Sequence, residues 1–218
     1  TAAPAPGVFS EVYGKLLKEG HEILSIHISS KLSGTYDSAV LGRKEQAGDG
    51  AIEIVDSLSV SMGIGLLAVV AARAAKEGSS LADVAIMVRK KMDELHLLGA
   101  LDTLEYLHKG GRLGKAQALL GSLLNFKPLI TVRGEVQPIG RVRTRVKAVN
   151  RLYELAQDFG HIDEMAVLHS TTPEDMEALA DRLAPLVPGK KIFRARFGPV
   201  LGTYTGPGIL AVAFLGGK

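Results

Sequence analysis

The stretch Glu22-Ile-Leu-Ser-Ile-His-Ile-Ser-Ser-Lys-Leu-Ser-Gly-Thr-Tyr-Asp-Ser38 decides the fold. It opens with a short apolar run, which predicts a buried β-strand and consists of Ile23, Leu24, Ile26 and Ile28. Hydroxyl-bearing residues and one glycine follow, and helix-compatible residues begin near Tyr36. We therefore expect a strand-to-helix turn. In an open parallel sheet, ligands bind in the crevice at the carboxyl ends of the strands.

The chemistry of this turn favours a small anion. Gly34 allows the backbone to approach a ligand closely, and the start of a helix offers unpaired N–H groups. Ser33 and Thr35 add hydroxyl donors. The turn therefore predicts a site for a carboxylate or a phosphate. The alternative is that the four hydroxyl residues of this turn only cap the helix, namely Ser29, Ser30, Ser33 and Thr35. The sequence leaves both interpretations open.

Helices and strands alternate through the first part of the chain. Amphipathic helix is expected over residues 8–19, strand over 52–55, and a helix that is apolar nearly all round over 62–76. A polar helix then ends near residue 95. This order is typical of a doubly wound parallel sheet.

The second part mixes a hairpin with helices. Strands are expected over residues 97–101, 129–132, 136–146, 165–169, 191–197 and 209–215, with a helix over 116–125 and a turn over 198–208. We predict an α/β protein of two α/β domains, the first (residues 1–95) built on a parallel doubly wound sheet and the second (residues 96–218) on a mixed α+β sheet.

Composition excludes several classes of function. The 218 residues carry 26 basic and 23 acidic side chains, a net charge of +3 that is too diffuse to indicate nucleic-acid binding. No cysteine is present, which excludes disulfides and thiolate metal sites and fits a cytoplasmic protein. The longest apolar run, near residues 64–72, is too short to span a bilayer. The start at Thr1 favours a fragment or a processed chain.

Two motifs suggest chemistry of other kinds. Ser33 is a candidate nucleophile, but no G-x-S-x-G elbow surrounds it and no histidine is placed by the sequence to act as its base. Gly63-Ile-Gly-Leu-Leu-Ala68 matches a dinucleotide-binding pattern, although its glycines lie beyond the strand and Asp83 falls in a helical first turn. Close helix packing explains these glycines better than a nucleotide does.

Basic residues offer two further candidates. Arg112, between glycines, can meet a carboxylate in a cleft or lie in a solvated turn. If the strand over 136–146 continues, the alternation of side chains places four cations on one face: Arg141, Arg143, Arg145 and Lys147. Such a row is either a solvated sheet face or a docking surface for an acidic partner. His169 is expected to face the cleft and His27 to be a satisfied core residue. No grouping predicts a metal site.

Five motifs together resemble the DegV family of bacterial fatty-acid-binding proteins, which includes the binding subunits of fatty acid kinase. They are Ile26-His-Ile-Ser-Ser-Lys-Leu-Ser-Gly-Thr-Tyr-Asp-Ser-Ala39, Val55-Asp-Ser57, Leu101-Asp-Thr-Leu-Glu-Tyr-Leu-His-Lys-Gly-Gly-Arg112, Leu124-Asn-Phe-Lys-Pro-Leu-Ile130 and Gly198-Pro-Val-Leu-Gly-Thr-Tyr-Thr-Gly-Pro-Gly208. The resemblance covers nearly the whole chain. By the same pattern, an N-terminal segment with an Asp-Ser strand is expected to be missing.

The resemblance implies one long-chain fatty acid in the cleft between the two domains, with its carboxylate near the polar turn and its acyl chain in an apolar tunnel. It implies that Ser33 is a carboxylate ligand, that Arg112 lies near the acid head or engages the kinase, and that Thr1 contacts the head group. Tyr204 departs from the pattern, since members commonly have histidine there. The protein is then a carrier that presents its lipid to a kinase catalytic subunit, with no cofactor and no catalysis of its own. The alternative is a small-molecule hydrolase or transferase that uses Ser33.

Overall fold

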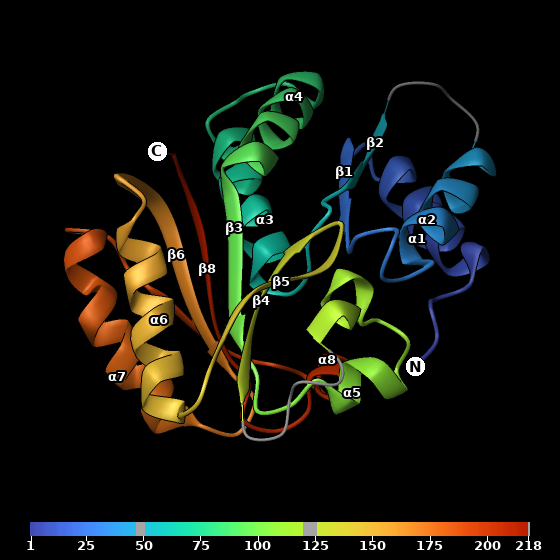
Figure 1. The fold of residues 1–218 in the computed structure, drawn as a ribbon. Helices are drawn as coiled ribbons and strands as arrows, with labels where there is room; N and C mark the ends of the chain where they lie inside the picture. The colour runs from blue at the N-terminus through green and yellow to red at the C-terminus, as the bar shows by residue number, and fades with distance from the viewer. Residues whose placement is uncertain (47–50, 120–125, 218) are drawn as a thin grey trace.

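The computed structural model describes residues 1–46, 51–119 and 126–217 (Figure 1). Its elements in the first part of the chain are α1 (Pro6–Lys18), β1 (Ile23–His27), α2 (Thr35–Lys44), β2 (Ile52–Asp56), α3 (Met62–Lys76), α4 (Leu81–Lys91) and the 3₁₀ turn η1 (Met92–Glu94). Those of the second part are β3 (Leu95–Ala100), α5 (Glu105–Lys109), η2 (Gly114–Leu119), β4 (Lys127–Arg133), β5 (Glu135–Val142), α6 (Arg145–Gln157), β6 (His161–His169), α7 (Pro173–Leu183), η3 (Ala184–Leu186), β7 (Phe193–Arg196), α8 (Pro199–Thr205) and β8 (Leu210–Gly217).

The strands form two sheets. The smaller sheet pairs β1 with β2 in parallel, with Ile23 opposite Ile52 and His27 opposite Asp56. The larger sheet has the order β5-β4-β3-β8-β6-β7, and all its neighbours are antiparallel except β6 and β7. This confirms the predicted α/β class, with a small parallel sheet and a larger mixed one.

Alternation of side chains buries both faces of the small sheet. Ile23 and Ile52 pack with Tyr13 of α1 and Ala39 of α2. The neighbouring residues Leu24 and Ile26 belong instead to the core around α3 and α4. Since successive strand residues point to opposite faces, β1 is covered by one helical pair on each side.

The large sheet is also covered on both faces. On β8, Leu210, Val212 and Phe214 pack beneath α6 and α7, which cover one face in Figure 1. The intervening residues Ala211, Ala213 and Leu215 face the core that contains α3. Helix α3 contacts strands of both sheets, so one buried core continues across residue 95. The division into domains 1–95 and 96–218 therefore stays a prediction.

The tip of the β4–β5 hairpin joins the two sheets. The Gly134 N–H donates to the carbonyl of Leu58, at 2.6 Å, in the loop after β2. The Ser29 hydroxyl, from the turn after β1, donates to the carbonyl of Gly134. Gly134 has a φ of +78°, a backbone conformation that favours glycine. These bonds fix the polar turn after β1 against the larger sheet.

Three sequence predictions need correction. The strand expected over 136–146 ends at Val142, because Thr144 caps α6 by accepting from the Lys147 N–H at 3.3 Å. The four cations therefore do not share one strand face. The turn expected over 198–208 contains α8. The helix expected over 116–125 is the 3₁₀ turn η2 as far as Leu119, and its remainder lies outside the described residues. No described helix is both long and apolar enough to cross a membrane.

Candidate functional site

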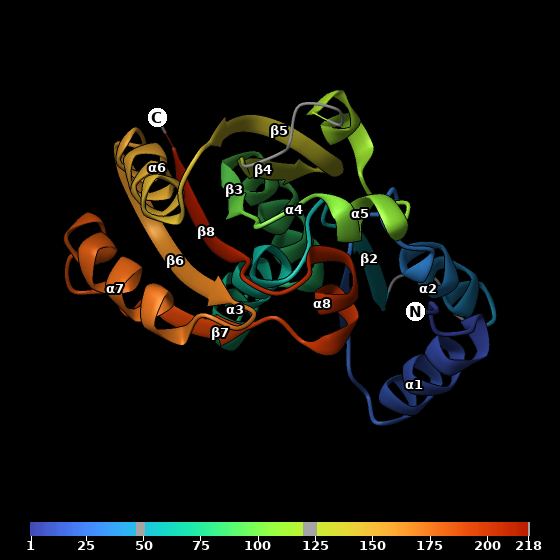
Figure 2. The same cartoon turned by 60° about the horizontal axis from the view of Figure 1, so that its bottom comes forward.

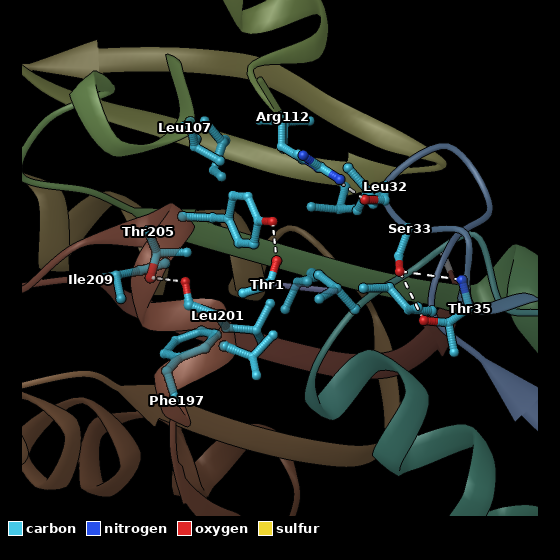
Figure 3. A pocket seen from close by; sticks show the side chains of 18 of the residues that line it. Thr1, Leu32, Ser33, Thr35, Leu107, Arg112, Phe197, Leu201, Thr205 and Ile209 are labelled. Atoms are coloured by element: carbon cyan, nitrogen blue, oxygen red, sulfur yellow. Dashed lines mark hydrogen bonds between the residues drawn. The ribbon is translucent and has the colours of Figure 1, made fainter. Parts of the chain in front are cut away.

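A cavity of about 280 Å³ lies between the turn after β1, the α5 loop, α8 and one face of the large sheet (Figure 3). All six residues predicted as ligands line it: Thr1, Ser33, Gly34, Thr35, Arg112 and Tyr204. They come from four separate parts of the chain, and the fold brings them together. Whether each binds a ligand stays a prediction.

The polar turn is held in a defined geometry. The Ser33 N–H donates to the Ser29 carbonyl at 3.1 Å, and α2 begins at Thr35. The Ser33 hydroxyl lies 2.8 Å from the Thr35 hydroxyl and also accepts from the Thr35 N–H at 3.3 Å. Two hydroxyl groups are thus paired beside the start of α2, where unpaired N–H groups and the helix dipole favour negative charge.

The neighbouring loop is braced by Asp56 at the end of β2. Its carboxylate accepts from the Ser30 N–H at 3.2 and 3.3 Å and from the Leu58 N–H at 3.1 Å. Leu58 and Ser61 both have positive φ, 51° and 57°. Residues other than glycine rarely adopt this backbone conformation, so the surrounding hydrogen bonds must hold the loop in place. Asp56 therefore acts on the shape of the site without lining it.

Arg112 brings a positive charge to the cavity. Its Nε donates to the Leu32 carbonyl at 3.1 Å and Nη1 donates to the Gly110 carbonyl at 2.8 Å. Its guanidinium carbon lies 5.1 Å from the centre of the Tyr204 ring. Within the described part of the chain it has no carboxylate partner. The charge is therefore held in position by neutral groups and is not neutralised.

Tyr204 and Thr1 meet across the cavity. Their hydroxyl groups form a hydrogen bond, drawn as a dashed line in Figure 3. Gly110 makes room for the tyrosine, because a Cβ at this position would lie 2.4 Å from Tyr204 Cδ1. The sequence places a tyrosine where the family pattern has histidine, and the structure turns that tyrosine toward the cavity.

Apart from Thr205, the remaining wall is apolar. It is formed by Ile28, Leu32, Val60, Leu97, Leu107, Ile130, Val132, Val136, Phe197, Val200, Leu201, Ile209 and Ala211. The sequence predicts the strands that contain most of these residues but does not indicate which side chains face the cavity. A buried strand residue gives the same pattern whether a core or a cavity faces it, so no local signal could have found them. Val200 and Leu201 were missed because α8 was not predicted.

Other candidates lie away from the cavity. His169 does not line it and is buried at the end of β6, so the expectation that it faces this cleft is wrong. His27 is half-buried and hydrogen-bonded to Ser25 at 2.7 Å. A Cβ at Gly63 would lie 2.1 Å from Ser59 Oγ, which explains this glycine by close packing.

The lining is chemically suited to an anionic amphiphile. It contains one arginine and several hydroxyl groups but no aspartate, glutamate or histidine. Among the described residues, no cluster of three or more His, Asp or Glu could hold a metal ion. No described histidine stands beside Ser33 as a base. The arrangement can bind an acidic head group at the hydroxyl and guanidinium donors, and an apolar chain along the wall.

Known proteins resemble this chain over nearly its whole length. The family model described as "Uncharacterised protein, DegV family COG1307" matches residues 1–216. A DegV domain-containing protein of Streptomyces coelicolor is 38% identical over 217 residues, which are 97% of this chain and 76% of the relative.

Solved structures show the same fold. One described as fatty acid binding of a DegV family protein from Thermus thermophilus has a TM-score of 0.91 at 33% identity, covering 99% of this chain and 78% of that one. DegV from Bacillus subtilis, described as a fatty acid binding protein, has a TM-score of 0.85 at 31% identity, covering 98% and 77%. The chain therefore belongs to the DegV family.

Proposed function

We propose that this protein binds one long-chain fatty acid in the cavity. The observation that carries the proposal is the position of Arg112, an unneutralised guanidinium beside paired hydroxyl groups at one part of a largely apolar cavity. Structural relatives are described as binding fatty acids, which supports the same ligand class here. The carboxylate lies near Ser33, Thr35 and Arg112, and the acyl chain follows the apolar wall.

The energetics favour such a ligand. Each methylene removed from water contributes about 0.8 kcal/mol, so a sixteen-carbon chain gains roughly 10 kcal/mol before the cost of ordering it. Desolvating the carboxylate opposes binding unless several donors meet it. The guanidinium of Arg112 and the hydroxyl groups of Ser33 and Thr35 are available as such donors. Tyr204 and Thr1 would exchange their mutual hydrogen bond for bonds to the head group.

The first experiment is extraction of the purified protein with organic solvent, followed by mass spectrometry of the released lipid. We expect close to one fatty acid per chain. Arg112→Gln should weaken the affinity of the delipidated protein about tenfold or more, because it removes the charge opposite the carboxylate. Lys109→Gln is the matched control, since Lys109 pairs with Glu105 at 2.6 Å and does not line the cavity. Equal affinity of the two variants, or no lipid uptake at all, would contradict the proposal.

The enzyme alternative predicts something different. A hydrolase or transferase using Ser33 would turn over substrate as an isolated chain and lose that activity in Ser33→Ala. The carrier shows no turnover, and Ser33→Ala only weakens fatty-acid binding. Among the described residues that line the cavity, Ser33 has no histidine beside it, and this favours the carrier because a serine needs a base to become a nucleophile.

We also propose that the protein presents its fatty acid to the catalytic subunit of a fatty acid kinase, in the cytoplasm. The resemblance to the binding subunits of fatty acid kinase suggests this partner. Three exposed cations lie at or just beyond the end of β5. The guanidinium carbons of Arg141 and Arg143 lie 5.0 and 5.9 Å from the centre of the Phe126 ring, and Lys147 is exposed on α6. They form a basic surface suited to an acidic partner.

Acyl phosphate formation tests this partnership. With a bacterial fatty acid kinase catalytic subunit and ATP added, Arg143→Glu should lower the rate while leaving fatty-acid affinity unchanged. Lys76→Glu, at the exposed end of α3, is the charge-matched control. If both variants lower the rate equally, the basic surface near β5 is not the docking site.

A further inference from the structure

A second pocket, of about 470 Å³, lies on the opposite side of α8 from the fatty-acid cavity. Phe197 lines both spaces, while Gly202 and Gly206 line only the second. The pocket is bounded by residues that directly follow β6 and the last residue of β7, namely Ser170, Thr171 and Arg196. Figure 2 shows the end of β6 beside β7 and α8.

The topology of this place favours a ligand. Strands β6 and β7 form the parallel pair of the large sheet, and His169 is opposite Arg196 at their carboxyl ends. The Phe197 N–H donates to the His169 carbonyl at 2.8 Å, which keeps the two chain segments together beyond the strands. Ligands in α/β proteins commonly bind where parallel strands end.

Ser170 supplies a buried donor with no partner. Only 7% of this residue is exposed, and its hydroxyl oxygen has no hydrogen-bond partner among the described residues. Its backbone groups are both used, by the Ile209 carbonyl and by Arg196. A buried polar group without a partner is costly, so this hydroxyl has a proton that it can donate to a ligand.

Arg196 supplies the charge. Its Nε donates to the Ser170 carbonyl at 3.2 Å, which directs the guanidinium to this pocket. Within the described ranges it has no carboxylate partner, whereas Arg194 on the same strand pairs with Glu177 at 2.6 Å and Asp181 at 3.4 Å. The Thr171 hydroxyl accepts from the Gly208 N–H at 3.0 Å and keeps its own proton to donate.

Nearby acids do not cancel this charge. Asp175, in the first turn of α7, is paired with Arg145 at 2.8 Å. Glu174 is exposed and does not line the pocket. A guanidinium with two hydroxyl donors matches the several acceptor oxygens of a phosphate group.

We propose that the pocket of Ser170, Thr171 and Arg196 binds a phosphate group, either as free phosphate or as the phosphate of a small phosphomonoester. This site is separate from the proposed fatty-acid cavity and does not depend on it. Ser170 and Thr171 donate to phosphate oxygens, and the free nitrogens of Arg196 pair with the anion.

The test is a titration of the protein with inorganic phosphate at constant ionic strength, balanced with chloride and followed by amide NMR shifts. We expect saturable shifts at Thr171, Gly198 and Gly206. Arg196→Gln should weaken binding about tenfold or more. Ser170→Ala should weaken it by roughly threefold to tenfold, because one hydrogen bond is lost. Arg194→Gln removes the same charge from the same strand and should change the affinity less than about twofold.

A second arm identifies the source of the phosphate. Ribose 5-phosphate that binds more tightly than inorganic phosphate assigns the site to a phosphomonoester, and weaker or equal binding assigns it to the free anion. The proposal is overturned if phosphate produces no saturable shifts, if ribose alone produces the same shifts, or if Arg194→Gln weakens binding as much as Arg196→Gln. Fatty-acid affinity, measured in the same Arg196→Gln protein, should stay within about twofold of the parent because Arg196 does not line that cavity.

Discussion

Arg112 lies over the ring of Tyr204, with its guanidinium carbon 5.1 Å from the ring centre. The ring face is the negative part of the aromatic quadrupole, so this contact stabilises the cation without a carboxylate. The tyrosine hydroxyl points away to Thr1. Tyr204 therefore has two separable parts: a ring that positions Arg112, and a hydroxyl that can reach a head group.

Tyr204→Phe separates these two parts. The phenylalanine keeps the ring beneath Arg112 and removes only the hydroxyl, so fatty-acid affinity should fall by about threefold to tenfold while the fold is unchanged. Fluorescence titration with a labelled fatty acid measures this. Tyr106→Phe is the control, because Tyr106 lies nearby but does not line the cavity. An unchanged affinity in Tyr204→Phe would show that the hydroxyl takes no part in binding.

Arg145 is expected to stabilise the fold rather than a docking surface. Its Nε donates to Asp175 at 2.8 Å, Nη2 donates to Thr172 at 3.0 Å, and Nη1 donates to the carbonyl of Gly208. Arg145→Met should lower the free energy of unfolding by about 1–3 kcal/mol, since it leaves these acceptors without a charged partner. The exposed Arg143→Met should change it by less than about 0.5 kcal/mol. Urea denaturation compares the two, and equal losses would contradict this assignment.

Sequence patterns predicted most elements because their signals are local. The apolar run of β1 and the nearly all-apolar composition of α3 were read correctly, and α3 has the predicted bounds of residues 62–76. Two predicted elements were wrong, and both lie in polar or glycine-rich segments. Arg145 fits strand alternation, but the cap at Thr144 starts a helix there. Gly198 and Gly206 flank a seven-residue helix that their glycine-rich stretch did not suggest.

The site was predictable only in part. Ser33 and Thr35 belong to one turn, so their proximity follows from the sequence. That Arg112 and Tyr204 join them, 79 and 171 residues after Ser33, was supplied by the family resemblance and not by any local pattern. The apolar wall could not be predicted, because burial in a core and exposure to a cavity give the same alternation.

Gly42 is expected to be required for packing between α1 and α2. A Cβ at this position would lie 2.7 Å from both Phe9 Cβ and the Pro6 carbonyl oxygen, and the latter is backbone that cannot rotate away. Gly42→Ala should therefore destabilise the protein by about 1–3 kcal/mol. At Gly7, in α1, a Cβ would meet nothing within 4 Å. Gly7→Ala should stabilise the protein by up to about 1 kcal/mol, because alanine is the better helix former. Thermal and urea unfolding of both variants measure these opposite signs.

His27 is expected to make stability depend on pH. Its Nε2 lies 2.7 Å from Ser25 Oγ, which in turn lies 2.7 Å from the Tyr13 hydroxyl. Burial lowers the pKa of His27, and the nearby carboxylate of Asp56 opposes this shift only in part. The unfolded chain therefore binds a proton at His27 more readily than the folded protein does. Its contribution to stability is complete above the unfolded pKa of about 6.5 and is lost as the pH falls toward the lower folded value.

The measurement is the free energy of unfolding at several values between about pH 5 and pH 8, where histidine is the side chain that normally titrates. The parent should lose stability as the pH falls through this range. His27→Gln should show a shallower decline, because glutamine has no proton to gain and its amide can still meet Ser25. His108→Gln, at an exposed position on α5, should keep the slope of the parent. If His27→Gln keeps the parent slope as well, the pH dependence arises elsewhere, and the bonds from Tyr13 to His27 serve only to hold α1 on β1.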